Sequence, residues 1–360
     1  MAQGGQRLEC RSLWSERADV TEQQQLAAWV QEQLAQAQIV TLQPLSGDAG
    51  FRRYFRVAES QPPVMAVYAP PATENSALYL AVSRLLAGGG VRVPAVLATD
   101  LQRGFLLVED CGDQLLLAAL NGSSVDVLYP QAMDMLLALQ ATAVPQDMLP
   151  FYDGQRLWDE MALFPTWFVQ GLLDQPFGRN EQALLDDCFD WLVHSALEQP
   201  QVLVHRDFHA RNLMLHAHSQ LPAELVTIDF QDAVVGPITY DLVSLLRDCY
   251  VRWQPEQVDK WALAYRKQLI QQGRQAGISE KQFLTWFDLM GLQRHIKVLG
   301  IFARLWLRDG KAGYLNDLPL VLHYTVAVAA KYPQAAHFVE WMEERVLPAC
   351  RRQPWWKPLP

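Results

Sequence analysis

The first part of the chain alternates short apolar runs with Gly- and Pro-containing breaks. Residues 21–38 place apolar side chains at helical spacing behind Thr21, a residue type that begins helices, and so predict a helix. Residues 42–71 contain two strand-like runs on either side of a Gly-containing turn at 46–50. A Pro-rich turn at 59–63 and a third strand-like run follow. This order predicts an antiparallel meander.

A second helical pattern and two more strand-like runs complete this region. In residues 73–90 the apolar positions fall on a helical stripe that ends at three consecutive glycines, and strand-like runs follow at 93–100 and 104–112. Beyond residue 112 the pattern is mainly helical, apart from strand-like pieces around 202–230. We therefore expect an α+β protein with two lobes. Residues 1–112 would form a small antiparallel β lobe with one main helix, ending in a hinge, and residues 113–360 a larger, mostly helical lobe.

Composition narrows the class of protein. Half of the 360 residues are hydrophobic and 19% are charged, which is typical of a folded chain rather than a disordered one. The formal net charge of -9 argues against nucleic acid as a partner. The N-terminal residues lack the apolar core of a secretory signal, and no later run has the roughly 20 apolar residues of a membrane span. We expect a cytoplasmic protein with no membrane partner.

Polar residues interrupt two apolar runs in the larger lobe. The segment "VLVHRDFHARNLML" contains Asp207 and, five residues later, Asn212, and "LVTID" ends in Asp229. Phosphoryl transfer requires a carboxylate that accepts the proton of the attacking hydroxyl, and oxygen ligands that hold Mg²⁺ against nucleotide phosphates. These three side chains form such a set. The alternative is that both aspartates are turn residues that accept hydrogen bonds from nearby amides.

The motifs "HRDFHARN", "RGFLLVEDCG" and "YDLVSLLRD" resemble those of the protein-kinase-like aminoglycoside and choline phosphotransferase group. With "FRRYFRV", "LFPTWFV" and "MGLQRHIKVLGIFARL", the resemblance extends over about residues 45–315 and is strongest to bacterial amino-sugar kinases. It implies a two-lobed protein-kinase-like fold that uses ATP and Mg²⁺. It also implies phosphorylation of the anomeric hydroxyl of N-acetylmuramate, N-acetylglucosamine or both, giving a sugar 1-phosphate for cell-wall sugar recycling.

The resemblance assigns roles to individual residues. Asp207 would be the catalytic base, and Asn212 and Asp229 would bind Mg²⁺. Backbone groups from Glu109 to Cys111 would pair with the adenine edge at the hinge, unless this segment is an ordinary strand end. Asp241 would support the catalytic loop through buried hydrogen bonds.

The nucleotide-binding lobe departs from the protein-kinase pattern. Its third strand-like run, "PVMAVYAPP", has no lysine to hold the nucleotide phosphates, and the Gly-rich loop retains only Gly47 and Gly50. Along an alternating strand Arg52 and Arg53 point to opposite faces, so one of them points beneath the lobe. We expect Arg52 or Arg53 to replace the lysine as a phosphate clamp. The alternative is that these arginines are solvated charges on the strand.

Candidate acceptor contacts lie in two places. Residues 286–310 predict a helix with a buried apolar stripe and with cations near a second face, for which a solvated surface is the default interpretation. The functional alternative is that His295 or Arg294 reaches the acceptor, where the lactyl carboxylate of N-acetylmuramate requires a counter-charge. Asp232, three residues beyond Asp229, is a further candidate that faces either the acceptor or solvent, and we expect it to face the acceptor.

Two other functions remain open from the sequence. One is a kinase for another small alcohol, such as an aminoglycoside or choline. The other is a pseudokinase that binds nucleotide or sugar without turnover, which the missing strand lysine would explain. Retention of Asp207, Asn212 and Asp229 argues against the pseudokinase.

Overall fold

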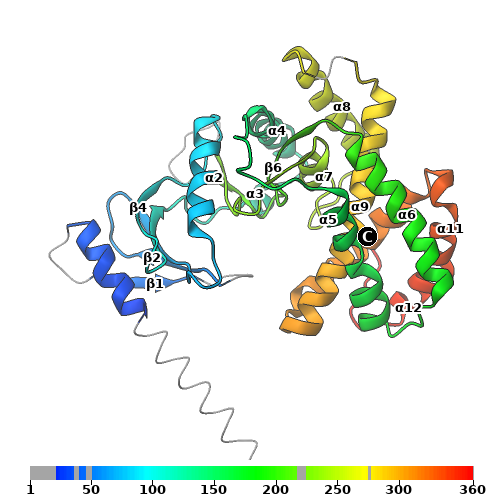
Figure 1. The fold of residues 1–360 in the computed structure, drawn as a ribbon, viewed down its shortest axis with the longest axis horizontal. Helices are drawn as coiled ribbons and strands as arrows, with labels where there is room; N and C mark the ends of the chain where they lie inside the picture. Colours follow the sequence, from blue (N-terminus) through cyan, green and yellow to red (C-terminus); the bar gives the residue numbers. More distant parts are fainter. Residues whose placement is uncertain (1–21, 36–39, 46–50, 217–223, 275–276, 360) are drawn as a thin grey trace, which may run out of the picture.

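The computed structural model describes residues 22–35, 40–45, 51–216, 224–274 and 277–359. The chain forms a small lobe around an antiparallel sheet and a larger, mostly helical lobe, which lie side by side in Figure 1. The predicted two-lobed α+β fold is confirmed. In the part of the chain that the structure describes, no helix is long and apolar enough to cross a membrane.

The sheet of the small lobe has five strands in the order β1-β2-β3-β5-β4, and each neighbouring pair is antiparallel. The predicted meander is therefore confirmed, although its first turn, at 46–50, lies outside the described residues. The strands are β1 (Leu42–Pro44), β2 (Arg53–Val57), β3 (Val64–Tyr68), β4 (Val96–Asp100) and β5 (Phe105–Glu109).

Helices cover both faces of this sheet because its strands alternate apolar side chains between the two sides. On one face, a helix over residues 22–33 packs Leu26, Trp29 and Val30 against the strands. On the other face lies α2 (Ser76–Gly88), whose apolar stripe belongs to the same core cluster as parts of the larger lobe. In Figure 1, α2 stands between the sheet and the larger lobe. The second face of the sheet is thus the one directed toward the rest of the molecule.

The larger lobe surrounds two small hairpin-like sheets with helices. Strand β6 (Gln201–Val204) pairs with β9 (Val234–Pro237), and β7 (Leu213–Leu215) pairs with β8 (Leu225–Thr227). The helices include α3 (Leu116–Ala119), α4 (Val125–Ala141), α5 (Gly154–Met161), the π-helix η1 (Phe164–Leu172), α6 (Arg179–Leu197), α7 (Tyr240–Leu246), α8 (Pro255–Gln271), α9 (Glu280–Asp309), the 3₁₀ helix η2 (Ala312–Asn316), α10 (Leu318–Ala329), the 3₁₀ helix η3 (Pro333–Ala335), α11 (Ala336–Trp341), the π-helix η4 (Met342–Val346) and α12 (Leu347–Arg351).

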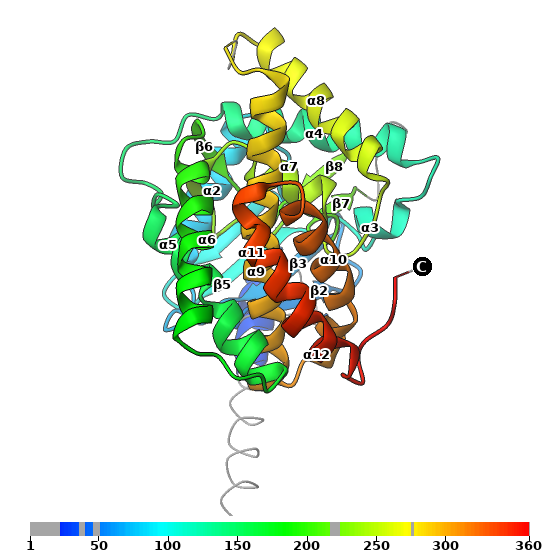
Figure 2. The same cartoon turned by 90° about the vertical axis from the view of Figure 1, so that its right-hand side faces the viewer.

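Helix α9 is the central element of this lobe, and η1, α6 and α10 pack against it; α6 and α10 can be followed beside it in Figure 2. Every residue from 286 to 300 is buried, so this part of the helix has no solvated face. The crossing with η1 is close at Gly300, where an added Cβ would lie 2.5 Å from the carbonyl carbon of Leu163. Only glycine allows the two backbones to approach this closely. Charged side chains of α9 therefore lie inside the lobe.

Candidate active site

The catalytic-loop segment, residues 205–212, lies between β6 and β7 and is held by buried carboxylates. Asp241, which is fully buried on α7, accepts hydrogen bonds from the backbone N–H groups of His205 at 2.6 Å and Arg206 at 3.0 Å. Asp248 accepts from the N–H of Ala210 at 2.9 Å. The predicted support of the loop by Asp241 is confirmed. Each of these bonds satisfies a backbone donor that burial would otherwise leave unpaired.

The structure brings together the three residues of the predicted phosphotransfer set. The Asn212 side-chain amide donates to the backbone oxygen of Asp207 at 3.1 Å and to Asp229 Oδ2 at 3.4 Å. Asp229 adopts a left-handed backbone conformation with φ 64°, and so does Arg206 with φ 77°. Such conformations are costly for residues other than glycine and concentrate at functional sites. An amide and a carboxylate, both suitable ligands for Mg²⁺, thus face each other beside Asp207.

The Asp207 carboxylate differs from its neighbours in having no donor. No hydrogen bond or ion pair reaches its side-chain oxygens from any residue that the structure describes. Burial acts to raise the pKa of Asp207, but nearby His209, Lys297, Arg294 and Arg206 outweigh it and hold the pKa below its usual value. Asp207 is therefore an ionised carboxylate with its accepting capacity unused.

A buried network of charges and hydroxyls lies behind the loop. Glu160 from α5 pairs with Lys297 of α9 at 2.8 Å and accepts a hydrogen bond from the Arg206 guanidinium. Lys297 Nζ also donates to the hydroxyl of Tyr240 at 3.0 Å, and the hydroxyl of Tyr152 donates to Glu160. Sequence reasoning missed Glu160, whose partners are far away along the chain. For Lys297 the signal was present, because it lies within a nearly uninterrupted apolar part of α9.

The small lobe places one of the two candidate arginines toward this site. Arg52 is 8% exposed, its Nε lies 3.1 Å from Glu74, and its guanidinium lies 5.0 Å from the centre of the Tyr79 ring. Tyr79 in turn stacks at 5.0 Å on Phe230, the residue after Asp229. A continuous chain of contacts thus connects Arg52 with the loop that carries Asp229.

Arg53 points to the opposite face of the sheet. Its guanidinium pairs with Glu22 at 2.6 Å and lies over the ring of Tyr68. This face packs on the helix over residues 22–33, away from Asp207. Gly47 and Gly50, the predicted remnant of the Gly-rich loop, lie outside the described residues.

The predicted hinge follows β5, and its side chains connect the two lobes. The Glu109 carboxylate pairs with Arg92 at 2.5 Å and lies 3.0 Å from His216 Nε2. The hydrogen bond from Arg92 is the main cause that lowers the pKa of Glu109 to about 2. Within the described chain the backbone N–H of Cys111, a buried residue, has no partner, whereas the N–H of Asp110 donates to Pro63 at 3.2 Å. The hinge therefore has a free backbone donor.

Two of the residues predicted to contact the acceptor, His295 and Asp232, do not share an open site with Asp207. His295 is fully buried, with Nε2 3.1 Å from the carbonyl oxygen of Arg247 and its ring stacked on Tyr324, so it does not line an open site. Asp232 is exposed and lines a recess of about 400 Å³ with Arg156 and the side chain of Arg206. Asp207 is not part of this recess. Among the acceptor candidates, Arg294 is the one whose charge contributes to lowering the pKa of Asp207.

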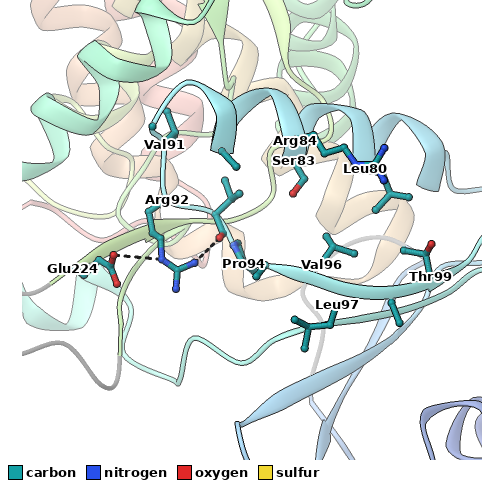
Figure 3. Close-up of a pocket in the computed structure, with 15 residues that line it drawn as sticks. Leu80, Ser83, Arg84, Val91, Arg92, Pro94, Val96, Leu97, Thr99 and Glu224 are labelled. Atoms are coloured by element: carbon teal, nitrogen blue, oxygen red, sulfur yellow. Dashed lines mark hydrogen bonds and ion pairs between the residues drawn. The ribbon is translucent and has the colours of Figure 1, made fainter. Parts of the chain in front are cut away.

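A larger cavity of about 620 Å³ lies on the small lobe between α2 and β4 (Figure 3). Its walls are mainly apolar, and Arg92 and Glu224, which are 3.5 Å apart, lie at one end. Asp207, Asn212 and Asp229 do not line it. This cavity is separate from the phosphotransfer set.

Comparisons with known proteins agree with this arrangement. Residues 41–277 match the model of the phosphotransferase enzyme family. A Pseudomonas putida protein named N-acetylmuramate/N-acetylglucosamine kinase is 40% identical over 331 residues, covering 89% of this chain and 96% of the relative. A Pseudomonas aeruginosa protein of the same name is 42% identical over 297 residues, covering 82% and 86%.

Solved structures share the fold at low sequence identity. An aminoglycoside phosphotransferase with bound ADP has a TM-score of 0.56 at 14% identity, covering 84% of this chain and 98% of that one. A choline kinase from Streptococcus pneumoniae has a TM-score of 0.58 at 12% identity, covering 85% and 99%. The two-lobed architecture is therefore that of these phosphotransferases.

Proposed function

Because the chain belongs to the phosphotransferase enzyme family, we propose that it is an ATP- and Mg²⁺-dependent kinase of N-acetylated amino sugars. The acceptor is N-acetylmuramate, N-acetylglucosamine or both, and the product is the sugar 1-phosphate. The observation that carries the proposal is the unbonded carboxylate of Asp207 beside Asn212 and Asp229. The names of relatives about 40% identical over nearly their whole length support the choice of sugar.

In the proposed reaction, the oxygen of the anomeric hydroxyl bonds to the γ-phosphorus of ATP, and Asp207 accepts the proton that this hydroxyl loses. The bond from that phosphorus to the bridging oxygen breaks, and ADP leaves with the electron pair. A base with a lowered pKa is sufficient because the transition state is largely dissociative and the hemiacetal hydroxyl is more acidic than an ordinary alcohol. Catalysis then consists mainly of positioning and electrostatic stabilisation.

Asn212 and Asp229 would hold Mg²⁺ together with phosphate and water oxygens. Mg²⁺ usually takes only one or two protein carboxylates and completes its octahedron with substrate phosphates and water, and this pair of side chains fits that requirement. The ion would neutralise charge that develops on the phosphates. Arg52 would act as the phosphate clamp, since it is the candidate arginine on the face that leads to Asp229. At the hinge, the free N–H of Cys111 would donate to the adenine edge.

The charges near Asp207 distinguish the proposed sugar kinase from kinases whose acceptors are cations. Arg206, Arg294 and Lys297 all lower the pKa of Asp207. Arg206 and Lys297 share the counter-ion Glu160, so the positive field beside Asp207 comes mainly from Arg294. Such a field disfavours choline and the polycationic aminoglycosides and suits neutral or acidic sugars. A non-catalytic binding protein would have no use for the complete phosphotransfer set.

Phosphorus-31 NMR with ATP and Mg²⁺ tests the proposal directly. Purified protein is incubated separately with N-acetylmuramate, N-acetylglucosamine, choline and kanamycin. We expect a new phosphate resonance, coupled to the anomeric proton, with one or both sugars. Signal with choline or kanamycin alone would reject the sugar assignment, and silence with all four would reject the kinase.

The Asp207→Asn variant tests the role of the base, with Asp126→Asn, an exposed carboxylate in the first turn of α4, as a control. General-base catalysis contributes about 10²–10⁴-fold, so turnover should fall by that factor in D207N and stay unchanged in D126N. Retention of most activity by D207N would remove Asp207 from its proposed role.

A further inference from the structure

Arg294 on α9 is an exception among the buried cations of the larger lobe. Arg247 pairs with Asp288 at 2.6 Å and Lys297 pairs with Glu160 at 2.8 Å. Arg294 is only 4% exposed, yet no carboxylate of the described chain lies within ion-pair distance of it. Among the described residues its Nε has no partner, and its one hydrogen-bond contact there joins Nη1 to Cys249 Sγ at 3.9 Å.

Leaving a buried guanidinium without a counter-ion destabilises the fold. Removing one partner of a buried pair is strongly destabilising because the remaining charge is desolvated, and the carboxylates of Asp207 and Asp248 act on Arg294 only from beyond ion-pair distance. The face of the Tyr240 ring, 5.8 Å away, compensates only a small part of this. A cation kept in this condition next to the reaction centre indicates a counter-charge that arrives with a ligand.

The surroundings of Arg294 place that ligand on the acceptor side. Arg294 contacts Cys249, and the ring of the next residue, Tyr250, lies 5.5 Å from the ring of His209, which follows Asp207 by two residues. The Nδ1 of His209 is buried and has no hydrogen-bond partner among the described residues. Asp207, His209 and Arg294 therefore lie together with unused hydrogen-bonding groups, one from each. A ligand that reaches Asp207 comes within the field of Arg294.

We propose that Arg294 is a specificity-determining residue that binds a carboxylate on the acceptor sugar. The inference rests on the proposed function and deepens it by naming the preferred substrate class, N-acetylated amino sugars with an acidic ether substituent. N-acetylmuramate carries a lactyl carboxylate at O3, on the second ring carbon from the anomeric carbon, whereas N-acetylglucosamine has a plain hydroxyl there. A guanidinium matches a carboxylate through two parallel hydrogen bonds. Arg294 then favours the acidic sugar over the neutral one.

The test needs no mutation in its first arm. Initial rates of wild-type enzyme are measured with N-acetylmuramate and with its neutral carboxamide, in which the lactyl acid is converted to an amide. A hydrogen bond between charged groups changes binding by about 10–100-fold, so kcat/KM should be lower for the amide by that factor. Equal kcat/KM for acid and amide would overturn the proposal.

The second arm uses Arg294→Gln and Arg294→Lys, with Arg308→Gln, an exposed α9 cation that pairs with its neighbour Asp309, as the control. R294Q should lose about 10–100-fold in kcat/KM for N-acetylmuramate and under about threefold for N-acetylglucosamine. R294K, which keeps the charge but not the fork, should recover part of the loss, and R308Q should match wild type. R294Q should also no longer distinguish the acid from its amide.

A positioning role for Arg294 gives a different result. If Arg294 only keeps Asp207 ionised or in place, R294Q lowers kcat equally for both sugars and shifts the acid limb of the pH profile, which overturns the proposal. Thermal melts and ATP calorimetry verify that each variant is folded. Failure of wild-type enzyme to phosphorylate either sugar would reject the proposed function, a result distinct from equal use of acid and amide.

Discussion

Glu160 is the carboxylate on which two cations behind the catalytic loop depend, and its replacement by glutamine tests that packing. Lys297 lies 2.8 Å from one carboxylate oxygen, and Arg206 donates to the other. The E160Q variant keeps the shape of the side chain and removes its charge. Lys297 and Arg206 are then left close together without a counter-ion.

The exposed fractions of the paired side chains determine how much stability the E160Q variant should lose. The side chain of Glu160 is 20% exposed and that of Lys297 is 8% exposed. Breaking a fully buried pair costs about 3–5 kcal/mol, whereas an exposed pair contributes at most about 1 kcal/mol. Because this pair is largely but not wholly buried, we expect E160Q to lower the free energy of unfolding by about 2–4 kcal/mol.

The pH dependence gives a second measurement. Burial acts to raise the pKa of Glu160, but Lys297 and Arg206 outweigh it and hold the pKa below its ordinary value of 4.5. A carboxyl group with a lowered pKa in the folded state stabilises the fold above its unfolded pKa, and this contribution is lost as the pH falls through the folded pKa. Wild type should therefore lose stability below pH 4.5, and E160Q should lose less over the same range.

Urea denaturation measures these changes through tryptophan fluorescence, for which the chain has 12 reporters. Lys297→Met and the E160Q/K297M double variant complete a double-mutant cycle at pH 7. We expect a coupling free energy of about 1–2 kcal/mol between the two side chains. Additivity within about 0.5 kcal/mol, or an E160Q acid profile that matches wild type, would refute the reasoning.

Two further predictions compare neighbouring or like residues. Arg52→Met should raise the KM for ATP or lower kcat by about tenfold or more through loss of a charge-assisted phosphate contact, whereas Arg53→Met, on the opposite sheet face, should stay near wild type in steady-state kinetics. Equal effects of the two substitutions on the KM for ATP and on kcat would show that Arg52 is not the phosphate clamp. Gly300→Ala should lower the melting temperature because its Cβ meets the Leu163 backbone at 2.5 Å, a strain of about 1–3 kcal/mol, whereas Gly313→Ala, with nothing within 4 Å, should not. A small shift for G300A would mean that the crossing of α9 and η1 relaxes easily.

The fold of the small lobe could be predicted from the sequence because the patterns that determine it are local. Strand alternation, Pro- and Gly-containing turns and the apolar stripe of α2 each depend on residues close together in the chain, and the five-strand antiparallel sheet has the predicted elements. Asp207, Asn212 and Asp229 were likewise found by motif, because short spacings fix where a loop between two strands presents its side chains. The structure adds that, of the two arginines, only Arg52 lies on the face of the sheet that leads to Asp229.

Contacts between side chains that are far apart in the chain could not be predicted from the sequence. The default interpretation of a solvated cationic face on α9 was wrong for Arg294 and Lys297, which are both buried. Helical periodicity identifies an apolar stripe but not how many neighbouring helices surround it, and α9 is enclosed on all sides over residues 286–300. Glu160, the partner of Lys297, lies on α5, and no local pattern connects the two positions.

The environments of the buried carboxyl groups explain why Asp207 is suited to its proposed role. Burial raises the pKa of Asp241 to about 7 and that of Asp248 to about 6, and backbone N–H groups occupy the oxygens of both. These two groups are the stronger bases, yet their lone pairs are already used to hold the loop. Asp207 is a weaker base with free lone pairs, surrounded by cations that keep it ionised. The proposed phosphoryl transfer to a hemiacetal would require a well-placed proton acceptor more than a strong one. The two stronger bases support the loop, and the weaker base, Asp207, is the one with lone pairs available for the proposed proton transfer.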